Sequence, residues 1–509
     1  MNEALAQLPE LAAAHLQLSL AALGLAAAVC LPLGVLAARS ARVGAAVLGV
    51  ASVAQTIPSL ALLAIMVPLL ATIGFLPALV ALTIYGALPI LRNTVAGITG
   101  VERALVEAAR GVGMTPRQQL LRVELPLAAP VIVAGLRTSA VWVVGTATLS
   151  TPVGAPSLGN LIFGGLQTRN TAFVAVGCVA AALLALGLDQ ILSLLESGVR
   201  TRRRGRVRGA SALLVGLALL AGGTALEARM APGEAPLKIG AKVFTEQYVL
   251  AEILAQHLRT ETGRPTEALQ GLGSTVLFDA LAKDEIDVYV DYSGTLWATI
   301  LKRTGTPPAR AVVLEEVTAY LAEEHGIAVA AALGFENTYA LAMRADRARS
   351  LWVARIGDLA SVAPSLEIAG DYEFFQRAEW AALTAAYTLP FGSTRTMDPT
   401  LMYSAVAEGE VDVISAYSTD GRIAALDLVL LEDERGVIPP YDALVLVGAA
   451  LQARAPDAVE ALRGLAGAID APTMQRMNGA VDQDGETPRE VAKRFLGKRS
   501  REEGGRDGV

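Results

Sequence analysis

The sequence predicts an all-α membrane domain with six spans, fused to an α/β domain. Of the 509 residues, 53% are hydrophobic and only 18% are charged, a composition that soluble proteins rarely have. The long apolar stretches lie within residues 16–226, whereas from residue 237 onward short apolar runs alternate with helical stretches. The chain therefore divides into a membrane part and a soluble part, and its length is also that of two or more domains.

The membrane part contains six candidate spans, because a helix that crosses a bilayer needs about 20 apolar residues. They are residues 16–38, 43–63, 69–91, 128–149, 171–188 and 209–226. The second and third are separated only by the region of Pro68, Gly74 and Pro77. We expect the transmembrane domain to occupy residues 1–228.

Basic residues predict how these spans are oriented. Residues 1–38 contain no Lys or Arg, whereas the loop 92–126 and the run 200–208 are rich in Arg. Because positively charged loops stay in the cytoplasm, we expect these two segments inside. The N-terminus and the whole soluble domain, residues 237–498, are then expected outside the cytoplasmic membrane.

Two short segments flank the soluble domain. Residues 229–236 include Pro232, Gly233 and Pro236, and we expect a short tether there. Residues 499–509 are charged and rich in Gly, and we expect a disordered tail.

Composition and motifs exclude several function classes. The formal net charge of −7 gives a nucleic-acid partner no electrostatic support. With two Cys and three scattered His, the chain offers neither a disulfide framework nor a Cys-rich metal site. The phosphate-binding pattern Gly-x-x-x-x-Gly-Lys-Ser/Thr does not occur in the sequence. We expect no cofactor, no metal and no catalytic activity in this chain.

The pattern of the soluble part predicts a β-sheet with helices. Seven apolar runs are expected to be strands: residues 237–243, 286–290, 339–343, 366–369, 411–416, 428–431 and 443–447. Ligands of such sheets bind beyond the carboxyl ends of the strands. We therefore expect a binding site formed by side chains near the strand ends: Lys242, Tyr292, Tyr339, Arg377 and Tyr417.

The chemistry of this set fits a trimethylammonium carboxylate. A quaternary ammonium has no proton to donate, so aromatic faces hold it by cation–π attraction, while Arg and Lys hold a carboxylate. The alternative is that the tyrosines are core residues with satisfied hydroxyls.

The loop 100–126 carries a motif at fixed spacing. It reads Glu107-Ala108-Ala109, three residues, Gly113, nine residues, then Val123-Glu-Leu125-Pro126. This resembles the EAA loop of ABC-importer permeases, with Val123 in place of Ile. The resemblance implies a short helix, a turn at Gly113, and a second helix that stops before Pro126. It also implies docking on a separate cytosolic ATPase subunit, with the permease working as a homodimer.

Further segments, residues 55–61, 88–94 and 157–163, resemble permeases of the osmoprotectant-type ABC importers. The strand-end segments are similar to the quaternary-amine-binding proteins of the same importers, which implies a two-lobed, periplasmic-binding-protein-like clamp. One lobe would hold residues 238–343 plus 440–498, and the other residues 344–439. The implied roles are cage walls for Tyr292, Tyr339 and Tyr417, with Tyr403 as a further cage candidate, and carboxylate binding for Lys242, Thr295 and Arg377.

That family imports glycine betaine, choline, carnitine and ergothioneine. The carboxylate-binding candidates Arg377 and Lys242 argue against choline, and the segment 373–380 looks closest to the ergothioneine branch. A choline or carnitine importer, and a ligand-binding membrane sensor or channel without an ATPase, remain alternatives.

Overall fold

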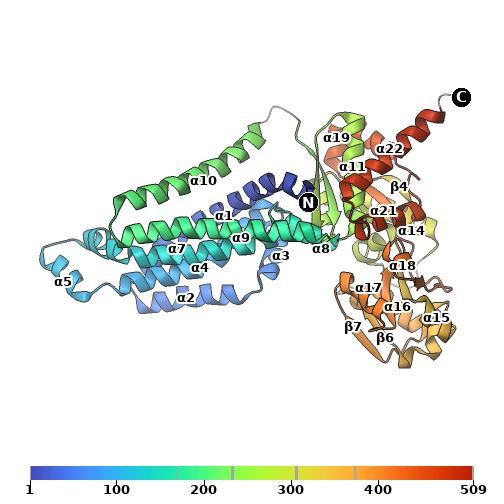
Figure 1. Ribbon diagram of the computed structural model, residues 1–509, viewed down its shortest axis with the longest axis horizontal. Helices are drawn as coiled ribbons and strands as arrows, with labels where there is room; N and C mark the ends of the chain where they lie inside the picture. Colours follow the sequence, from blue (N-terminus) through green and yellow to red (C-terminus); the bar gives the residue numbers. More distant parts are fainter. Residues whose placement is uncertain (1, 169, 231–233, 304–307, 372–373, 507–509) are drawn as a thin grey trace. The chain divides into compact units, whose positions relative to one another are not determined.

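The computed structural model describes the chain except for residues 1, 169, 231–233, 304–307, 372–373 and 507–509. The chain forms two compact units: residues 1–166 with 171–233, and residues 234–509 with 167–170. The first unit is helical and the second is α/β, as the sequence predicts (Figure 1).

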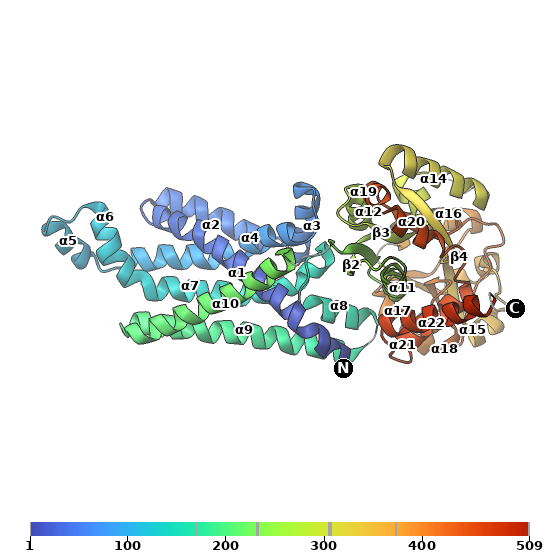
Figure 2. The same cartoon turned by 90° about the horizontal axis from the view of Figure 1, so that it is seen from above.

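The first unit is built from long helices that lie side by side (Figures 1 and 2). Its helices are α1 (Asn2–Ala37), α2 (Ala41–Thr56), α3 (Ser59–Leu70), α4 (Phe75–Thr99), α5 (Arg103–Gly111), α6 (Pro116–Gln119), the π-helical turn η1 (Leu120–Glu124), α7 (Leu125–Ala147), the 3₁₀ turn η2 (Thr148–Val153), α8 (Gly159–Gln167), α9 (Thr171–Arg200) and α10 (Arg204–Met230). Small and apolar side chains of α1, α4, α7 and α9 form its buried core.

The predicted division into spans is wrong around residues 43–91. Within the described part of the chain, four helices are long and apolar enough to cross a membrane, and the pair α2 and α3, bent by 100°, would make a fifth. The second expected span, 43–63, is interrupted at Pro58, which disfavours a helical conformation at Ile57. The third, 69–91, is interrupted before α4, where Gly74 has a φ of +86°.

The sixth expected span, 209–226, falls within α10. The side chains of α10 from residue 221 onward lie outside the described part of the chain. The six-span count therefore stays a prediction.

The loop that carries the Glu-Ala-Ala motif forms α5, a turn and α6, and both views place these helices at one end of the helical unit (Figures 1 and 2). Gly113 makes the turn with a φ of +81°, and Thr115 then begins α6 with a capping box to Gln118. The expectation that the second helix stops before Pro126 is wrong. The π-helical turn leads directly into α7 instead. Pro126 lies in the first turn of α7, a position where proline is tolerated although it has no amide hydrogen to donate.

The second unit contains two five-stranded sheets. The first has the order β2-β1-β3-β10-β4 and consists of β1 (Leu237–Lys242), β2 (Thr266–Leu272), β3 (Val288–Tyr292), β4 (Ala328–Glu336) and β10 (Asp442–Val447). The second has the order β7-β6-β8-β5-β9 and consists of β5 (Tyr339–Arg344), β6 (Glu367–Gly370), β7 (Ser393–Thr396), β8 (Val413–Tyr417) and β9 (Leu428–Leu430). Each sheet mixes parallel and antiparallel pairs.

Helices and short turns cover these sheets. They are α11 (Thr245–Thr262), α12 (Ser274–Ala282), α13 (Ser293–Thr295), η3 (Leu296–Ile300), α14 (Arg310–His325), α15 (Ala345–Leu351), η4 (Ile356–Ser361), η5 (Ala363–Ser365), η6 (Phe374–Gln376), α16 (Ala378–Tyr387), α17 (Pro399–Glu408), α18 (Arg422–Ala425), α19 (Ala449–Arg454), α20 (Pro456–Arg463), α21 (Ala471–Asp482) and α22 (Pro488–Arg506). In Figure 1, α11, α19, α21 and α22 accompany the first sheet, while α15, α16 and α17 accompany the second.

Each sheet is the centre of one lobe, so the two-lobed architecture is present. The chain passes from the first sheet to the second at residues 337–338, between β4 and β5, and returns between β9 and β10. The predicted boundary after residue 343 is therefore late, because β5 already pairs with β8 and β9 of the second sheet.

The expected disordered tail from residue 499 is helical instead, because α22 continues to Arg506. Its first half contributes Val491 and Ala492 to the core, and α22 packs on α11. Helix formers such as Arg and Glu then extend an anchored helix at little cost. Residues 507–509 of that expected tail, and residues 231–233 of the expected tether, lie outside the described residues.

Candidate ligand-binding site

Strand ends of both lobes meet at one cavity of about 330 Å³. β1 ends there with Lys242 and β3 with Tyr292, while β5 begins with Tyr339 opposite Tyr417, the last residue of β8. Six of the seven residues predicted for the ligand site line this cavity: Lys242, Tyr292, Thr295, Tyr339, Arg377 and Tyr417. The strand-end pattern therefore brings six of these residues to one cavity, and their binding of a ligand stays a prediction.

Aromatic rings form one wall of the cavity. The ring of Phe244 lies 6.0 Å from that of Tyr417, at an interplanar angle of 3°, and 6.3 Å from that of Tyr292. Tyr339 lies 4.9 Å from Tyr417 and 5.9 Å from Tyr441. These centroid separations are those of favourable aromatic pairs, so the rings support one another and present a continuous π surface.

Two of these rings already carry a cation of the protein. Lys242 Nζ lies 5.5 Å from the centroid of Tyr292, and Arg377 Cζ lies 5.0 Å from the centroid of Tyr339. Among the described residues, no Lys or Arg lies over Phe244 or Tyr417 in this way. The faces of those two rings are therefore the part of the wall best suited to an additional cation.

Lys242 is not an isolated charge. Its ammonium group is buried and lies 2.5 Å from Asp291 Oδ1. The same carboxylate accepts hydrogen bonds from the Tyr289 hydroxyl at 2.8 Å and from the backbone N–H of Tyr292 at 2.8 Å. Lys242 thus fixes the end of β3, and its charge is balanced before any ligand is present.

Arg377 is held in a similar manner. Its side chain is 12% exposed, and it donates to Glu379 Oε1 from Nη2 at 3.1 Å and from Nε at 3.3 Å. Glu379 also accepts a hydrogen bond of 2.5 Å from the Tyr441 hydroxyl. Burial opposes ionisation of both groups, yet the facing charges keep the pKa of Arg377 above its usual value and that of Glu379 below it. The guanidinium is therefore charged and pre-positioned in the cavity.

Glu246, at the start of α11, is a buried carboxylate with four hydrogen-bond donors. It accepts from the Tyr292 hydroxyl at 2.5 Å, from Asn337 Nδ2 at 2.9 Å, from Asn478 Nδ2 at 3.1 Å, and from the Thr419 hydroxyl. Burial raises its pKa, against the effect of these donors. Because a carboxylate accepts about four hydrogen bonds, Glu246 organises its neighbours rather than offering an open acceptor.

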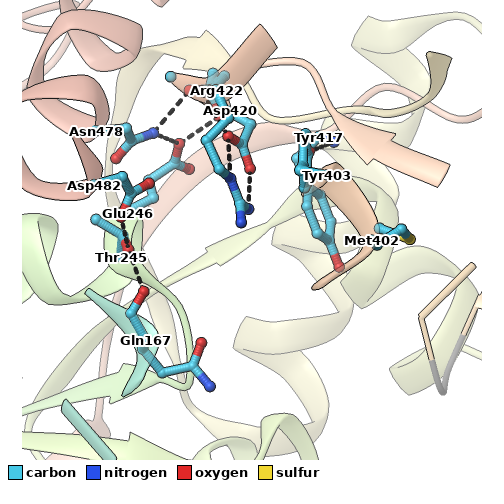
Figure 3. Close-up of polar contacts among 12 residues, drawn as sticks. Gln167, Thr245, Glu246, Met402, Tyr403, Tyr417, Asp420, Arg422, Asn478 and Asp482 are labelled. Carbon is cyan, nitrogen blue, oxygen red and sulfur yellow. Dashed lines mark hydrogen bonds and ion pairs between the residues drawn. The ribbon is translucent and has the colours of Figure 1, made fainter. Parts of the chain in front are cut away.

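Tyr403 is the one predicted cage residue that does not line the cavity. Its side chain is fully buried in the core of the second lobe, and its hydroxyl accepts a hydrogen bond of 3.2 Å from the backbone N–H of Tyr417. Its ring lies 3.8 Å from the guanidinium carbon of Arg422, which Asp420 pairs at 2.5 Å (Figure 3). Tyr403 therefore supports the wall from behind, and its expected place in the cage is wrong.

Sequence reasoning missed several lining residues: Phe244, Glu246, Asn337, Asp371, Arg422 and Tyr441. Phe244 and Glu246 follow Lys242 almost directly, so the same strand-end rule could have included them. Tyr441 precedes β10, the antiparallel strand of the first sheet, whose beginning rather than end lies at the cavity. Among the described residues no group of three or more His, Cys, Asp or Glu could hold a metal ion.

The predicted ATPase-coupling residues lie in the helical unit. Glu107, Ala108 and Ala109 are on α5, with Glu107 and Ala108 exposed and Ala109 buried. Gly113 is in the turn after α5, and Leu125 and Pro126 begin α7. Glu124, directly before them, is buried and forms a two-pronged ion pair with Arg39 at the end of α1.

Both units match known families. The family described as the substrate binding domain of ABC-type glycine betaine transport system matches residues 235–498. The family described as binding-protein-dependent transport system inner membrane component matches residues 30–201. The match to a permease family and the long apolar helices identify the chain as an integral membrane protein.

Similar proteins span both units or one of them. The chain is 31% identical over 436 residues to the ergothioneine transport permease/ergothioneine binding protein EgtU of Helicobacter pylori strain G27, covering 83% of this chain and 78% of EgtU. It is 45% identical over 182 residues to the carnitine transport permease protein OpuCB of Listeria monocytogenes, covering 36% of this chain and 83% of that protein. The carnitine transport binding protein OpuCC of Listeria monocytogenes strain 10403S is 30% identical over 273 residues, with coverage of 53% and 88%. The chain therefore belongs to the ABC-type glycine betaine transport family, as a fusion of the inner-membrane permease component with the substrate-binding domain.

Proposed function

We propose that this chain captures a trimethylammonium betaine outside the cell and conducts it across the cytoplasmic membrane. The observation that carries this proposal is one cavity that combines an aromatic wall with the buried guanidinium of Arg377. The faces of Phe244 and Tyr417 suit a quaternary ammonium, and Arg377 suits a carboxylate.

Within the betaines, we propose a ligand larger than glycine betaine, with ergothioneine as the first candidate. The fused arrangement shared with EgtU supports this choice.

The energy for transport would come from a separate ATPase subunit, because this sequence has no phosphate-binding loop. We propose that α5, with Glu107 and Ala108 exposed on its surface, docks on that subunit, and that two copies of the chain form one importer. The Arg-rich segments 92–126 and 200–208 support a cytoplasmic side for α5 and an external side for the binding domain.

Calorimetric titration of the full-length chain in lipid nanodiscs tests the ligand. Ergothioneine, glycine betaine, carnitine and choline would be compared in one buffer, and we expect ergothioneine to bind most tightly and choline most weakly. Tightest binding of choline would contradict the role of Arg377. Absence of binding by all four would contradict the betaine site itself.

Uptake in cells that express the chain with its ATPase tests the coupling. Glu107→Lys should abolish uptake and leave ligand affinity unchanged, because it alters only the exposed surface of α5. Uptake by this variant at the wild-type rate would favour a sensor or channel that needs no ATPase.

A further inference from the structure

The two lobes touch through α21 of the first lobe, which packs on α11 and β4, and the segment 418–421 of the second lobe. Three side-chain amides of α21 and its end donate to three backbone carbonyls of that segment. Gln475 Nε2 lies 2.9 Å from the oxygen of Ser418, Asn478 Nδ2 lies 2.8 Å from that of Thr419, and Gln483 Nε2 lies 2.6 Å from that of Gly421.

Gly421 allows the two backbones to approach closely. A Cβ atom at this position would lie 2.5 Å from the backbone nitrogen of Gly479 and 2.6 Å from its Cα. Both of these are backbone atoms of a helix, so they cannot move aside as the end of a flexible side chain does. Any side chain at Gly421 would therefore hold the segment away from α21 and break the contact between the lobes.

The segment 418–421 is joined directly to the aromatic wall. It follows Tyr417, whose ring stacks on Phe244 of the first lobe at 6.0 Å. Thr419 donates to Glu246, which also accepts a hydrogen bond from the hydroxyl of Tyr292 in the first lobe. Contact of the segment with α21 thus holds Tyr417 of the second lobe beside Phe244 and Tyr292 of the first.

We infer that α21 is the surface on which the second lobe closes, and that Gly421, Gln475 and Gln483 position Tyr417 against Phe244 for ligand binding. This inference rests on the proposed function, because it assumes that the cavity binds a trimethylammonium ligand. None of these three residues needs to touch the ligand. They determine the affinity for the ligand through the fraction of protein molecules in which the two lobes are in contact.

Gly421→Ala in the full-length chain is the decisive variant. We expect the dissociation constant for ergothioneine to rise about tenfold or more, chiefly through faster dissociation, because a separated lobe releases the ligand. Gly497→Ala is the matched control, since it adds the same methyl group to a helix of the first lobe with no atom within 4 Å. The control should bind like the wild type.

A distance measurement separates lost closure from general damage. Dyes at Ser350 on α15 and Lys493 on α22, both exposed, would report the separation of the lobes after Cys30 and Cys178 are replaced. In the wild type we expect a larger short-distance population than in Gly421→Ala, with and without ligand. Equal populations together with equal affinities would overturn the inference.

Gln475→Ala combined with Gln483→Ala gives a second test that leaves the backbone unchanged. Both side chains are exposed and neither lines the cavity, so this variant decides the question even if Gly421→Ala does not fold. We expect about threefold to tenfold weaker binding and a smaller short-distance population, and unchanged values would refute the inference. If the wild type itself binds no trimethylammonium compound, the proposed function fails, while the distance populations still decide whether α21 is the closing surface.

Discussion

Changing Arg377 and Glu379 together to glutamine should remove the preference of the site for ligands that carry a carboxylate. The double change is needed because the two side chains are buried against each other, at 12% and 6% exposure. Arg377→Gln alone would leave Glu379 as a buried charge without its partner, a loss of about 3–5 kcal/mol in stability. The double variant removes both charges and keeps side chains that can hydrogen-bond to each other and to Tyr441.

The size of the effect follows from what the guanidinium offers a ligand. A carboxylate that loses a charged hydrogen-bond partner in a buried site loses about 2–4 kcal/mol, or about 30-fold to 1,000-fold in affinity. Choline has no carboxylate, so its affinity should change by no more than about threefold. The ratio of betaine affinity to choline affinity should therefore collapse, even if both affinities also shift through small changes in the wall around Tyr339.

Isothermal titration of the full-length chain with glycine betaine, ergothioneine and choline measures this ratio. Glu379→Gln alone is the control: it leaves the buried guanidinium without its acidic partner and so lowers stability, but it keeps the guanidinium and should keep the preference for carboxylates. An unchanged ratio in the double variant would show that the carboxylate binds elsewhere in the cavity. Lys242 would then be the next candidate, even though Asp291 already balances its charge.

Phe244→Ala and Tyr417→Ala should each weaken binding of every trimethylammonium ligand by about 1–2 kcal/mol, while Tyr417→Phe should change it far less, because the ring face remains; equal losses for Phe and Ala at position 417 would show that the hydroxyl matters instead. Arg39→Glu and Glu124→Arg should each reduce ATP-driven uptake, and the two together should restore part of it if their ion pair ties α1 to the start of α7; a double variant no better than either single one would contradict that link. The pKa of Glu379 is lowered in the folded chain, so its charge stabilises the fold above about pH 4.5 and this stability is lost as the pH falls through the folded pKa. The melting temperature of the wild type should therefore exceed that of Glu379→Gln at pH 7, and the two should converge in acid. A constant difference between pH 7 and acid would contradict a lowered pKa of Glu379 in the folded chain.

Seven of the ten strands of the binding domain lie where apolar runs predict them, and the three missed strands share one property. β2 and β4 are the two edges of the first sheet, and β7 is an edge of the second. Edge strands are covered less: all four residues of β7 are exposed, and most residues of β2 and β4 are only partly buried. The search for apolar runs therefore finds every interior strand, but of the four edge strands it finds only β9.

The residues that line the cavity were predicted more fully than the partners of their side chains. Lys242 and Tyr292 end β1 and β3, and Arg377 lies beyond the end of β6, directly before α16; all three line one cavity. The acidic partners Asp291 and Glu379 could not be foreseen as partners, since ion pairing depends on side-chain direction. For the same reason the sequence could not separate a ring that lines the cavity, such as Tyr417, from a ring that lies behind it, such as Tyr403.

The strand order of the first lobe has a consequence for how the protein is made. β10 lies between β3 and β4 in the sheet, but it is the last strand to be synthesised, after the whole second lobe. Until β10 arrives, β3 and β4 each expose an unpaired edge that can join another chain. The second lobe, in contrast, is complete in one continuous stretch of sequence. During biogenesis the first lobe therefore remains open to aggregation for the longest time, and a truncation that removes β10 would leave both of its neighbours unprotected.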